Sequence, residues 1–377
     1  MDSGTFLTQD LGGKHMAAKG ESLLETRDLT VNFHTYRGEV KALDHVQLSL
    51  YPHEVLALVG ESGCGKSVTA LTILGLLPGN AHVLEGQILY KGEDLLKKSP
   101  EQMQEIRAEG IAAIFQDPMT FLNPVLTVGV QLKEAFLVQK HLWTAQTRDK
   151  SATGAVDAQI RGFLLEKETE KEGSKRESGR DREKIAEELS KDILKLVRLA
   201  DPERILTQYP HELSGGMRQR CMIAMALARR PSIIVADEIT TALDVTVQAQ
   251  ILTLLKELRD TIDASSILIT HDLSVAAETA DRIAVMYAGH VVEVASTIEL
   301  FRKPLHPYTQ LLMKCIPDVR KPVTHLESIS GTVPDLIDPP TGCRFHPRCP
   351  FAMEVCKTTK PVLKDIGNGH LVHCHLF

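Results

Sequence analysis

The sequence predicts an α/β fold in which helices cover a parallel sheet. Three short apolar runs have the length of buried strands: IAAIF (111–115), SIIVA (232–236) and SILIT (266–270). Stretches with helical spacing separate these runs, and strands that alternate with helices form parallel sheets. Residues 23–59 first alternate between polar and apolar and then become continuously apolar, which predicts several more strands, the last of them fully buried.

The segments between these strands carry their own signals. SVTALTILGLLP has helical spacing, and its helix should end at Pro78. GQILYKGEDL predicts a hairpin with Lys91 and Gly92 at its turn. Residues 166–184 contain 14 charged residues out of 19, of both signs, so we expect an exposed, mobile insertion there. Helical patterning returns directly afterwards, in IAEELSKDILKLVRLA.

Composition divides the chain into three parts. Residues 1–22 predict a flexible N-terminal extension, and residues 23–300 hold the predicted α/β domain. Residues 301–377 are rich in Pro, His and Cys, which predicts a separate C-terminal module.

Length and charge exclude several classes of function. The 377 residues suffice for one large domain and a smaller one. The formal net charge of −6 argues against non-specific nucleic-acid binding, which needs a basic surface. No apolar stretch reaches the roughly 20 residues of a membrane-spanning helix, and the N-terminus lacks the basic lead and apolar core of a secretory signal. We therefore expect a cytoplasmic protein, in which disulfides are normally reduced.

A phosphate-binding loop is the strongest functional signal. GESGCGKS (60–67) fits the pattern G-x-x-x-x-G-K-[ST] after a buried strand and at the start of a helix. Its glycines let backbone N–H groups surround phosphates, and the helix N-terminus adds positive potential. Lys66 would reach the terminal phosphates, and Ser67 would offer its hydroxyl to Mg²⁺. Cys64 is expected to be a tolerated small residue.

Polar side chains follow three other predicted strands. Asp237 and Glu238 follow one apolar run, His271 follows another and Gln116 follows a third. Since open parallel sheets bind ligands at the carboxyl ends of their strands, these side chains should converge on the same nucleotide. Taken singly, the Asp could cap a helix, the His could be a core residue and the Gln could cap a turn. Their agreement with the loop favours a site.

Charge assigns a role to each of these residues. Asp237 would hold Mg²⁺, directly or through water. Glu238 would polarise the attacking water as general base, while His271 and Gln116 would sense or position the γ-phosphate. Phosphoryl transfer depends mainly on such positioning and on charge neutralisation.

A second glycine-rich helix start decides the class. LSGGMRQR (213–220) places Ser214 and two glycines where anions bind helix N-termini, although alone it could be simple capping. Taken in order, the loop, Gln116, this string, the Asp-Glu pair, ALDV and His271 resemble the ATP-binding-cassette (ABC) family over roughly residues 23–300.

The resemblance implies a P-loop NTPase fold with a parallel core sheet, an antiparallel β subdomain and a helical subdomain at about 120–230. It also implies that two cassettes pair head to tail, so that each ATP lies between one subunit's P-loop and the other's signature, the LSGGM string at 213–217. The implied catalytic residues are Glu238 and His271. The implied ATP-binding residues are Gly60, Glu61, Ser62, Gly63, Cys64, Gly65, Lys66, Ser67, Val68 and Gln116, and the implied Mg²⁺ residues are Ser67, Gln116 and Asp237. The implied contacts to the partner's ATP are Ser214, Gly215, Gly216, Met217 and Asp244.

Two positions need comment against this family pattern. An aromatic residue upstream of the P-loop stacks on adenine in the family, and Tyr36 is the candidate here. The family reads D-E-P-T where this chain reads DEIT, so Ile239 replaces a proline. This change could loosen the turn, but it removes no catalytic group, and we still expect hydrolysis.

Four cysteines, at positions 343, 349, 356 and 374, fall in the last 35 residues. Four thiolates suit either tetrahedral Zn²⁺ or an iron–sulfur cluster, and the spacings are wider than typical zinc knuckles. Arg344, Arg348 and Lys357 lie among them and should offset the thiolate charge. Resemblance to the oligopeptide/dipeptide branch favours a structural [4Fe–4S] cluster on Cys343, Cys349, Cys356 and Cys374, with Zn²⁺ and unligated thiols as alternatives.

The branch resemblance rests on VGESGCGKSVTALTILGLLP, FQDPMTFLNPVLTVGVQL, TTALDVTVQAQIL, LFRKPLHPYTQLLMKCIPD and GCRFHPRCPFAMEVC. It implies an ATP-hydrolysing subunit at the cytoplasmic face of the membrane. Its partners would be a second, distinct cassette, two integral-membrane permeases and, indirectly, an extracytoplasmic peptide-binding protein, without nucleic acid. Alternatives are import of nickel or metal chelates within the same branch, and a non-transport ABC ATPase that acts on ribosomes or DNA.

Overall fold

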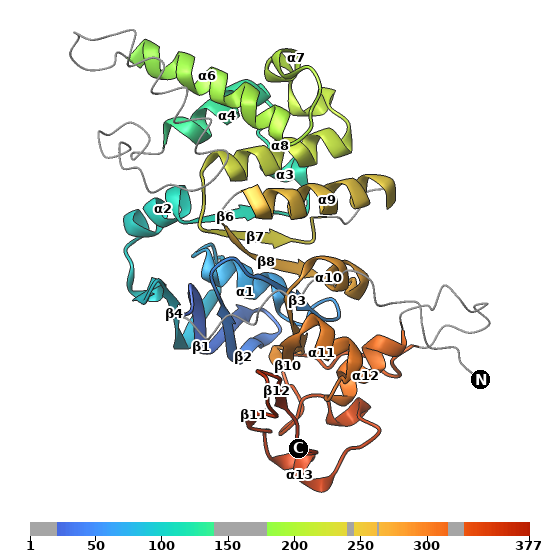
Figure 1. Cartoon of the computed structure of the whole chain (residues 1–377). Coiled ribbons are helices and arrows are strands. Elements are labelled where there is room, and N and C mark those ends of the chain that lie inside the picture. The colour runs from blue at the N-terminus through green and yellow to red at the C-terminus, as the bar shows by residue number, and fades with distance from the viewer. Residues whose placement is uncertain (1–20, 139–178, 240–244, 262–263, 316–327) are drawn as a thin grey trace, which may run out of the picture.

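The computed structural model describes residues 21–138, 179–239, 245–261, 264–315 and 328–377. Residues 1–20 of the predicted extension, residues 166–178 of the predicted insertion, and Asp244 lie outside these ranges. In the described part, strands of two sheets occupy the middle of the molecule, and helices gather at one end (Figure 1).

The smaller sheet is antiparallel, with four strands in the order β2-β1-β4-β5. Its strands are β1 (Leu24–Thr35), β2 (Gly38–Leu50), β4 (Ala81–Tyr90) and β5 (Glu93–Asp94). The predicted hairpin is confirmed by β4 and β5, which pair Leu89 with Asp94. Lys91 and Gly92 both have positive φ, 51° and 82°, as the tightest hairpin turns require.

The larger sheet has eight strands in the order β11-β12-β10-β9-β3-β8-β7-β6. Its strands are β3 (Val55–Val59), β6 (Ile111–Ile114), β7 (Ile233–Asp237), β8 (Ser265–Thr270), β9 (Arg282–Tyr287), β10 (His290–Ser296), β11 (Leu363–Asp365) and β12 (Leu371–His373). The three predicted apolar strands are confirmed as β6, β7 and β8, and every residue of β3 is buried. Because β9, β3, β8, β7 and β6 are parallel, their carboxyl ends share one edge.

Helices at one end of the molecule pack together beyond strand β6 (Figure 1). They are α3 (Pro118–Phe121), α4 (Val128–Leu137), α6 (Gly179–Leu196), α7 (Pro202–Thr207), η4 (Pro210–Glu212) and α8 (Gly215–Ala228). Helix α6 begins six residues before the predicted return of helical patterning, because its charged first residues are good helix formers. Ile185, Leu189 and Ile193 turn its apolar face into the core shared with α4 and α8.

The remaining helices border the two sheets. They are α1 (Lys66–Ile73), η1 (Leu95–Lys97), α2 (Pro100–Glu109), α9 (Val245–Thr261), α10 (Leu273–Thr279), α11 (Thr297–Arg302), α12 (Pro307–Lys314), η5 (His346–Arg348) and α13 (Glu354–Thr358). The prediction that the first of these continues to Pro78 was wrong, because Gly75 adopts a left-handed φ of 63° just after the last helical turn. In the described residues, no helix combines the length and the apolar composition that crossing a membrane requires.

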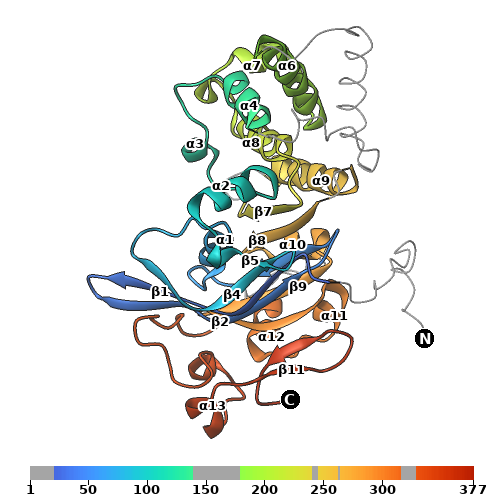
Figure 2. The same cartoon turned by 90° about the vertical axis from the view of Figure 1, so that its left-hand side faces the viewer.

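Residues 301–315 and 328–377 share a sheet and a core with the cassette (Figure 2). Strand β12 pairs with β10, and Tyr308 and Phe345 pack on Tyr287 with ring centroids 4.7 and 5.0 Å away. Glu293 of β10 is completely buried and accepts hydrogen bonds from the N–H groups of Leu305 and His306, at 2.7 and 2.9 Å. These contacts fix the end of the chain against the parallel strands.

Candidate active site

The loop of residues 60–67 joins β3 to α1 with a conformation that needs its glycines. Gly63 and Gly65 have φ of 77° and 107°, in the left-handed region. A Cβ on Gly60 would lie 2.1 Å from the carbonyl oxygen of Met286, so only glycine fits there. Nζ of Lys66 donates to the carbonyl oxygens of Gly60 and Glu61, at 2.8 and 3.1 Å, which holds the ammonium over the loop.

Cys64 packs inward from the same loop. Its side chain is fully buried, and burial raises the pKa of its thiol. The thiol thus fills the core beneath the loop, as expected for a tolerated small residue.

The carboxyl end of β7 meets the start of α1. Oγ of Ser67 donates to Oδ1 of Asp237 over 3.3 Å. Burial raises the pKa of Asp237, and the bond from Ser67 opposes that rise. A hydroxyl and a carboxylate beside a phosphate-binding loop are the ligand types that Mg²⁺ takes in P-loop proteins.

The side chain of Glu238 contacts residues at the ends of two other strands. Nε2 of Gln116, after β6, donates to its Oε2 over 3.1 Å, and Nδ1 of His271, after β8, lies 3.4 Å from its Oε1. The structure therefore brings Lys66, Ser67 and Asp237 into one group and Gln116, Glu238 and His271 into an adjoining one, because Asp237 and Glu238 are neighbours in the chain. This convergence is the arrangement that the strand ends predict.

The backbone of Glu238 is strained. Its φ of 46° lies in the left-handed region, which costs a non-glycine residue about 1–2 kcal/mol. Its N–H donates to the carbonyl oxygen of Ile269 over 3.0 Å, and the next residue, Ile239, is buried in the core shared with the helices. Ile239, which replaces the family's proline, is thus an apolar anchor directly after the strained residue.

The signature residues lie apart from these groups. Ser214 caps the 14-residue helix α8, and its Oγ accepts the N–H of Met217 over 3.3 Å. Ser214 and Gly215 are exposed, and α8 packs with α4 and α6 at the helical end of the molecule. Tyr36 lies in the turn between β1 and β2 with 98% of its surface exposed, and its role in adenine stacking stays a prediction.

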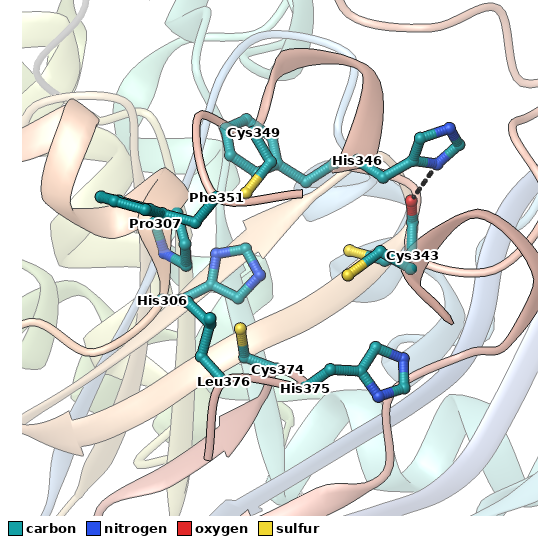
Figure 3. A pocket seen from close by; sticks show the side chains of 11 residues that line it. His306, Pro307, Cys343, His346, Cys349, Phe351, Cys374, His375 and Leu376 are labelled. Carbon is teal, nitrogen blue, oxygen red and sulfur yellow. Dashed lines mark hydrogen bonds between the residues drawn. The ribbon is translucent and has the colours of Figure 1, made fainter. Parts of the chain in front are cut away.

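All four C-terminal cysteines line one pocket (Figure 3). They carry free thiols, and His306, His346 and Phe351 are among the other lining residues. Burial, together with the neighbouring thiols, raises the pKa of Cys343 to about 11, and burial also raises that of Cys349 and Cys374. Among the residues that the structure describes, no three or more His, Cys, Asp or Glu side chains form a group that could hold a metal ion. The pocket has the donor chemistry of a thiolate site without ligating geometry.

The expectation that nearby cations offset thiolate charge was wrong. Nη2 of Arg344 donates to Asp44 over 2.9 Å, and Arg348 forms an ion pair with Glu61. Lys357 bonds Glu354 on its own helix, over 2.6 Å. Each of the three cations is thus paired with a carboxylate.

Sequence reasoning missed two residues that contact the phosphate-binding loop. Arg348 and Tyr308 both reach Glu61 from the C-terminal part of the chain. Each lies in a segment that the branch resemblance already singles out, LHPYTQLL and FHPRC. The contact itself has no signal in a single sequence.

Models of two known protein families match this chain. A family model described as "ABC transporter" matches residues 43–241, and one described as "Oligopeptide/dipeptide transporter, C-terminal region" matches residues 292–356. The "Probable peptide ABC transporter ATP-binding protein y4tR" of Sinorhizobium fredii is 47% identical, covering 94% of this chain and 95% of the relative. The "Dipeptide transport ATP-binding protein DppD" of Bacillus subtilis is 45% identical, with 94% and 95% covered.

This chain is similar in fold to a solved structure. The dimeric, post-hydrolysis ATP-binding cassette MJ0796, bound to ADP and Pi, is 26% identical with a TM-score of 0.54, covering 73% of this chain and 98% of that one. This chain therefore belongs to the ABC transporter family, as an ATP-hydrolysing subunit of its oligopeptide/dipeptide transporter branch.

Proposed function

We propose that this chain hydrolyses ATP at the 60–67 loop to power uptake of di- or oligopeptides through separate permease subunits at the cytoplasmic face of the membrane. The observation that carries the proposal is the convergence of Gln116, Glu238 and His271 beside the pair of Ser67 and Asp237. Relatives described as peptide and dipeptide transport proteins support peptides as cargo.

Each residue of the two groups has a task in this reaction. Backbone N–H groups of the loop and Nζ of Lys66 bind the phosphates. Ser67 and Asp237 would hold Mg²⁺, which would neutralise charge on the phosphates. Glu238 accepts a proton from the attacking water, and Gln116 and His271 orient its carboxylate through the two contacts already present.

The exposed signature supports a two-cassette arrangement. Ser214 and Gly215 start helix α8 facing solvent, and their anion-binding N–H groups serve a second cassette's ATP. The related cassette MJ0796 is dimeric in its post-hydrolysis state. We propose that the second cassette is a distinct homologue and that the pair closes on ATP and reopens after hydrolysis, driving two permeases that receive cargo from an extracytoplasmic binding protein.

Peptide uptake tests the cargo assignment. In cells that depend on this chain, its removal should abolish uptake of a labelled dipeptide or oligopeptide, because the permeases then lack their source of energy. Wild-type chain should restore uptake, and the Glu238→Gln variant should not. Intact peptide uptake together with lost ⁶³Ni uptake would instead support nickel import, and co-sedimentation with ribosomes or DNA without any uptake defect would support the non-transport alternative.

We also propose that the cysteine pocket binds a [4Fe–4S] cluster through Cys343, Cys349, Cys356 and Cys374, with Zn²⁺ as the alternative. The support is that four free thiols line one pocket. Binding would release protons from these thiols, and it would stabilise the segment that carries them. The cluster has a structural role in this proposal and takes no part in hydrolysis.

Metal analysis of anaerobically purified protein tests this assignment. We expect iron and sulfide in equal amounts with broad visible absorbance, since the cluster holds both. Cys343→Ser should lose most of the iron. Cys315→Ser is the matched control, because Cys315 ends helix α12 outside the pocket, and it should keep its iron. A colourless protein that holds zinc, or no metal at all, would contradict the cluster.

A further inference from the structure

Two residues from the C-terminal part of the chain hydrogen-bond to Glu61 of the phosphate-binding loop. Nη1 and Nη2 of Arg348 donate to the two carboxylate oxygens of Glu61, at 2.8 and 3.1 Å. The N–H of Glu61 donates to the hydroxyl oxygen of Tyr308 over 3.0 Å. The side chain and the backbone of one loop residue are thus held by two residues more than 240 positions away.

Arg348 is itself held in place. Its side chain is only 5% exposed, whereas that of Glu61 is 30% exposed. Nε of Arg348 donates to the carbonyl oxygen of Ser330 over 3.0 Å, and Nη1 donates to the hydroxyl of Tyr287 over 3.3 Å. A guanidinium fixed in this way presents a rigid fork to the carboxylate.

Tyr308 is equally constrained. It is fully buried, and its ring packs against those of Tyr287 and Phe345, with centroids 4.7 and 5.3 Å away. Its hydroxyl therefore meets the loop at a fixed point.

Glu61 also positions Lys66. The carbonyl oxygen of Glu61 accepts a hydrogen bond from Nζ of Lys66 over 3.1 Å. Movement of Glu61 would therefore displace both the loop backbone and the ammonium that faces the phosphates.

We propose that Arg348 and Tyr308 are positioning residues that preform the phosphate-binding loop through Glu61, so that the C-terminal segment sets the affinity for ATP. This inference rests on the proposed role of the loop in nucleotide binding. A loop that is held before ATP arrives loses less conformational freedom on binding. Arg348 lies between Cys343 and Cys349 in the chain, so the segment that lines the cysteine pocket also provides the contact with Glu61.

The affinity of the full-length protein for ATP tests the inference. Arg348→Ala should raise the Kd and the KM for ATP by about fivefold to tenfold and leave kcat within about twofold, because only ground-state positioning is lost. Tyr308→Phe, which removes a single oxygen, should raise the Kd in the same direction and carries the test if Arg348→Ala fails to fold. Lys360→Ala is the matched control, because Lys360 joins the same segment to Asp44 instead of to Glu61.

A double-mutant comparison of Arg348 with Glu61 distinguishes a specific contact with the loop from general destabilisation of the C-terminal segment. In a Glu61→Gln background, which lacks the charged partner, Arg348→Ala should add little further loss, because the two residues act as one unit. Arg348→Lys should recover part of the affinity, since it keeps the charge without the fork.

Three results would overturn the inference. They are an unchanged Kd in both Arg348→Ala and Tyr308→Phe, an equal loss in Lys360→Ala, and fully additive losses in the double variant. If the wild-type protein itself failed to bind ATP, or bound it as well after Lys66→Ala, the proposed function would fail together with the inference.

Discussion

Glu238→Gln should lower kcat for ATP hydrolysis by about 100-fold to 10,000-fold, the range that general acid–base catalysis contributes. The amide cannot accept the proton of the attacking water. It has nearly the same shape and still contacts Gln116 and His271, so ATP binding should change little. The structure favours this residue because two strand ends orient its carboxylate, at 3.1 and 3.4 Å.

The measurement is steady-state hydrolysis together with the Kd for ATP. Glu278→Gln is the matched control, because Glu278 is an exposed carboxylate on α10 that pairs with Lys256, and it should hydrolyse ATP at the wild-type rate. A Glu238→Gln protein with wild-type turnover would remove Glu238 from the role of general base.

Lys66→Ala should raise the Kd for ATP by about 100-fold, because a hydrogen bond to a charged group contributes up to about 3 kcal/mol and each 1.4 kcal/mol is about tenfold in affinity. Lys66 is 5% exposed, and its ammonium is already held by two loop carbonyls, so it should meet the phosphates with little reorganisation. Equilibrium titration with a fluorescent ATP analogue measures the effect.

Stability must be separated from binding in this variant. The variant loses the two hydrogen bonds from Nζ, so its thermal unfolding is compared with that of the wild-type protein without nucleotide. A large drop in Tm would indicate that the substitution destabilises the fold. Lys98→Ala removes a half-buried lysine that pairs with Glu93 outside the loop, and this variant should bind ATP normally. An unchanged Kd in Lys66→Ala would contradict the assigned phosphate contact.

The two variants separate binding from chemistry. Lys66→Ala acts on the ground state, so its effect appears in Kd, whereas Glu238→Gln acts on the transition state, so its effect appears in kcat.

The nucleotide site is predictable from sequence because its signals are local. A loop with fixed glycine spacing between a buried strand and a helix has few other uses, and the strand ends can be identified from short apolar runs. The parallel order of β3, β8 and β7 then forces Lys66, Asp237 and His271 to one edge of the sheet. Periodicity and the strand-end rule suffice for that step.

The C-terminal part is less predictable because its contacts span the chain. Arg344 meets Asp44 across 300 positions, and Arg348 meets Glu61 across 287. No local pattern encodes which carboxylate a distant arginine will meet, so proximity in sequence wrongly assigned both arginines to the thiols. Strands β11 and β12 were missed for a similar reason: each has only three residues, too few to show an alternating pattern.

The most direct measurement is a crystal structure of the Glu238→Gln protein with ATP and Mg²⁺, since slow hydrolysis preserves the nucleotide. We expect Nζ of Lys66 on the terminal phosphates, Mg²⁺ on Ser67 and Asp237, and Gln116 and His271 facing the γ-phosphate. ATP bound elsewhere, with these side chains turned away from it, would contradict the assignment of this sheet edge as the site of hydrolysis.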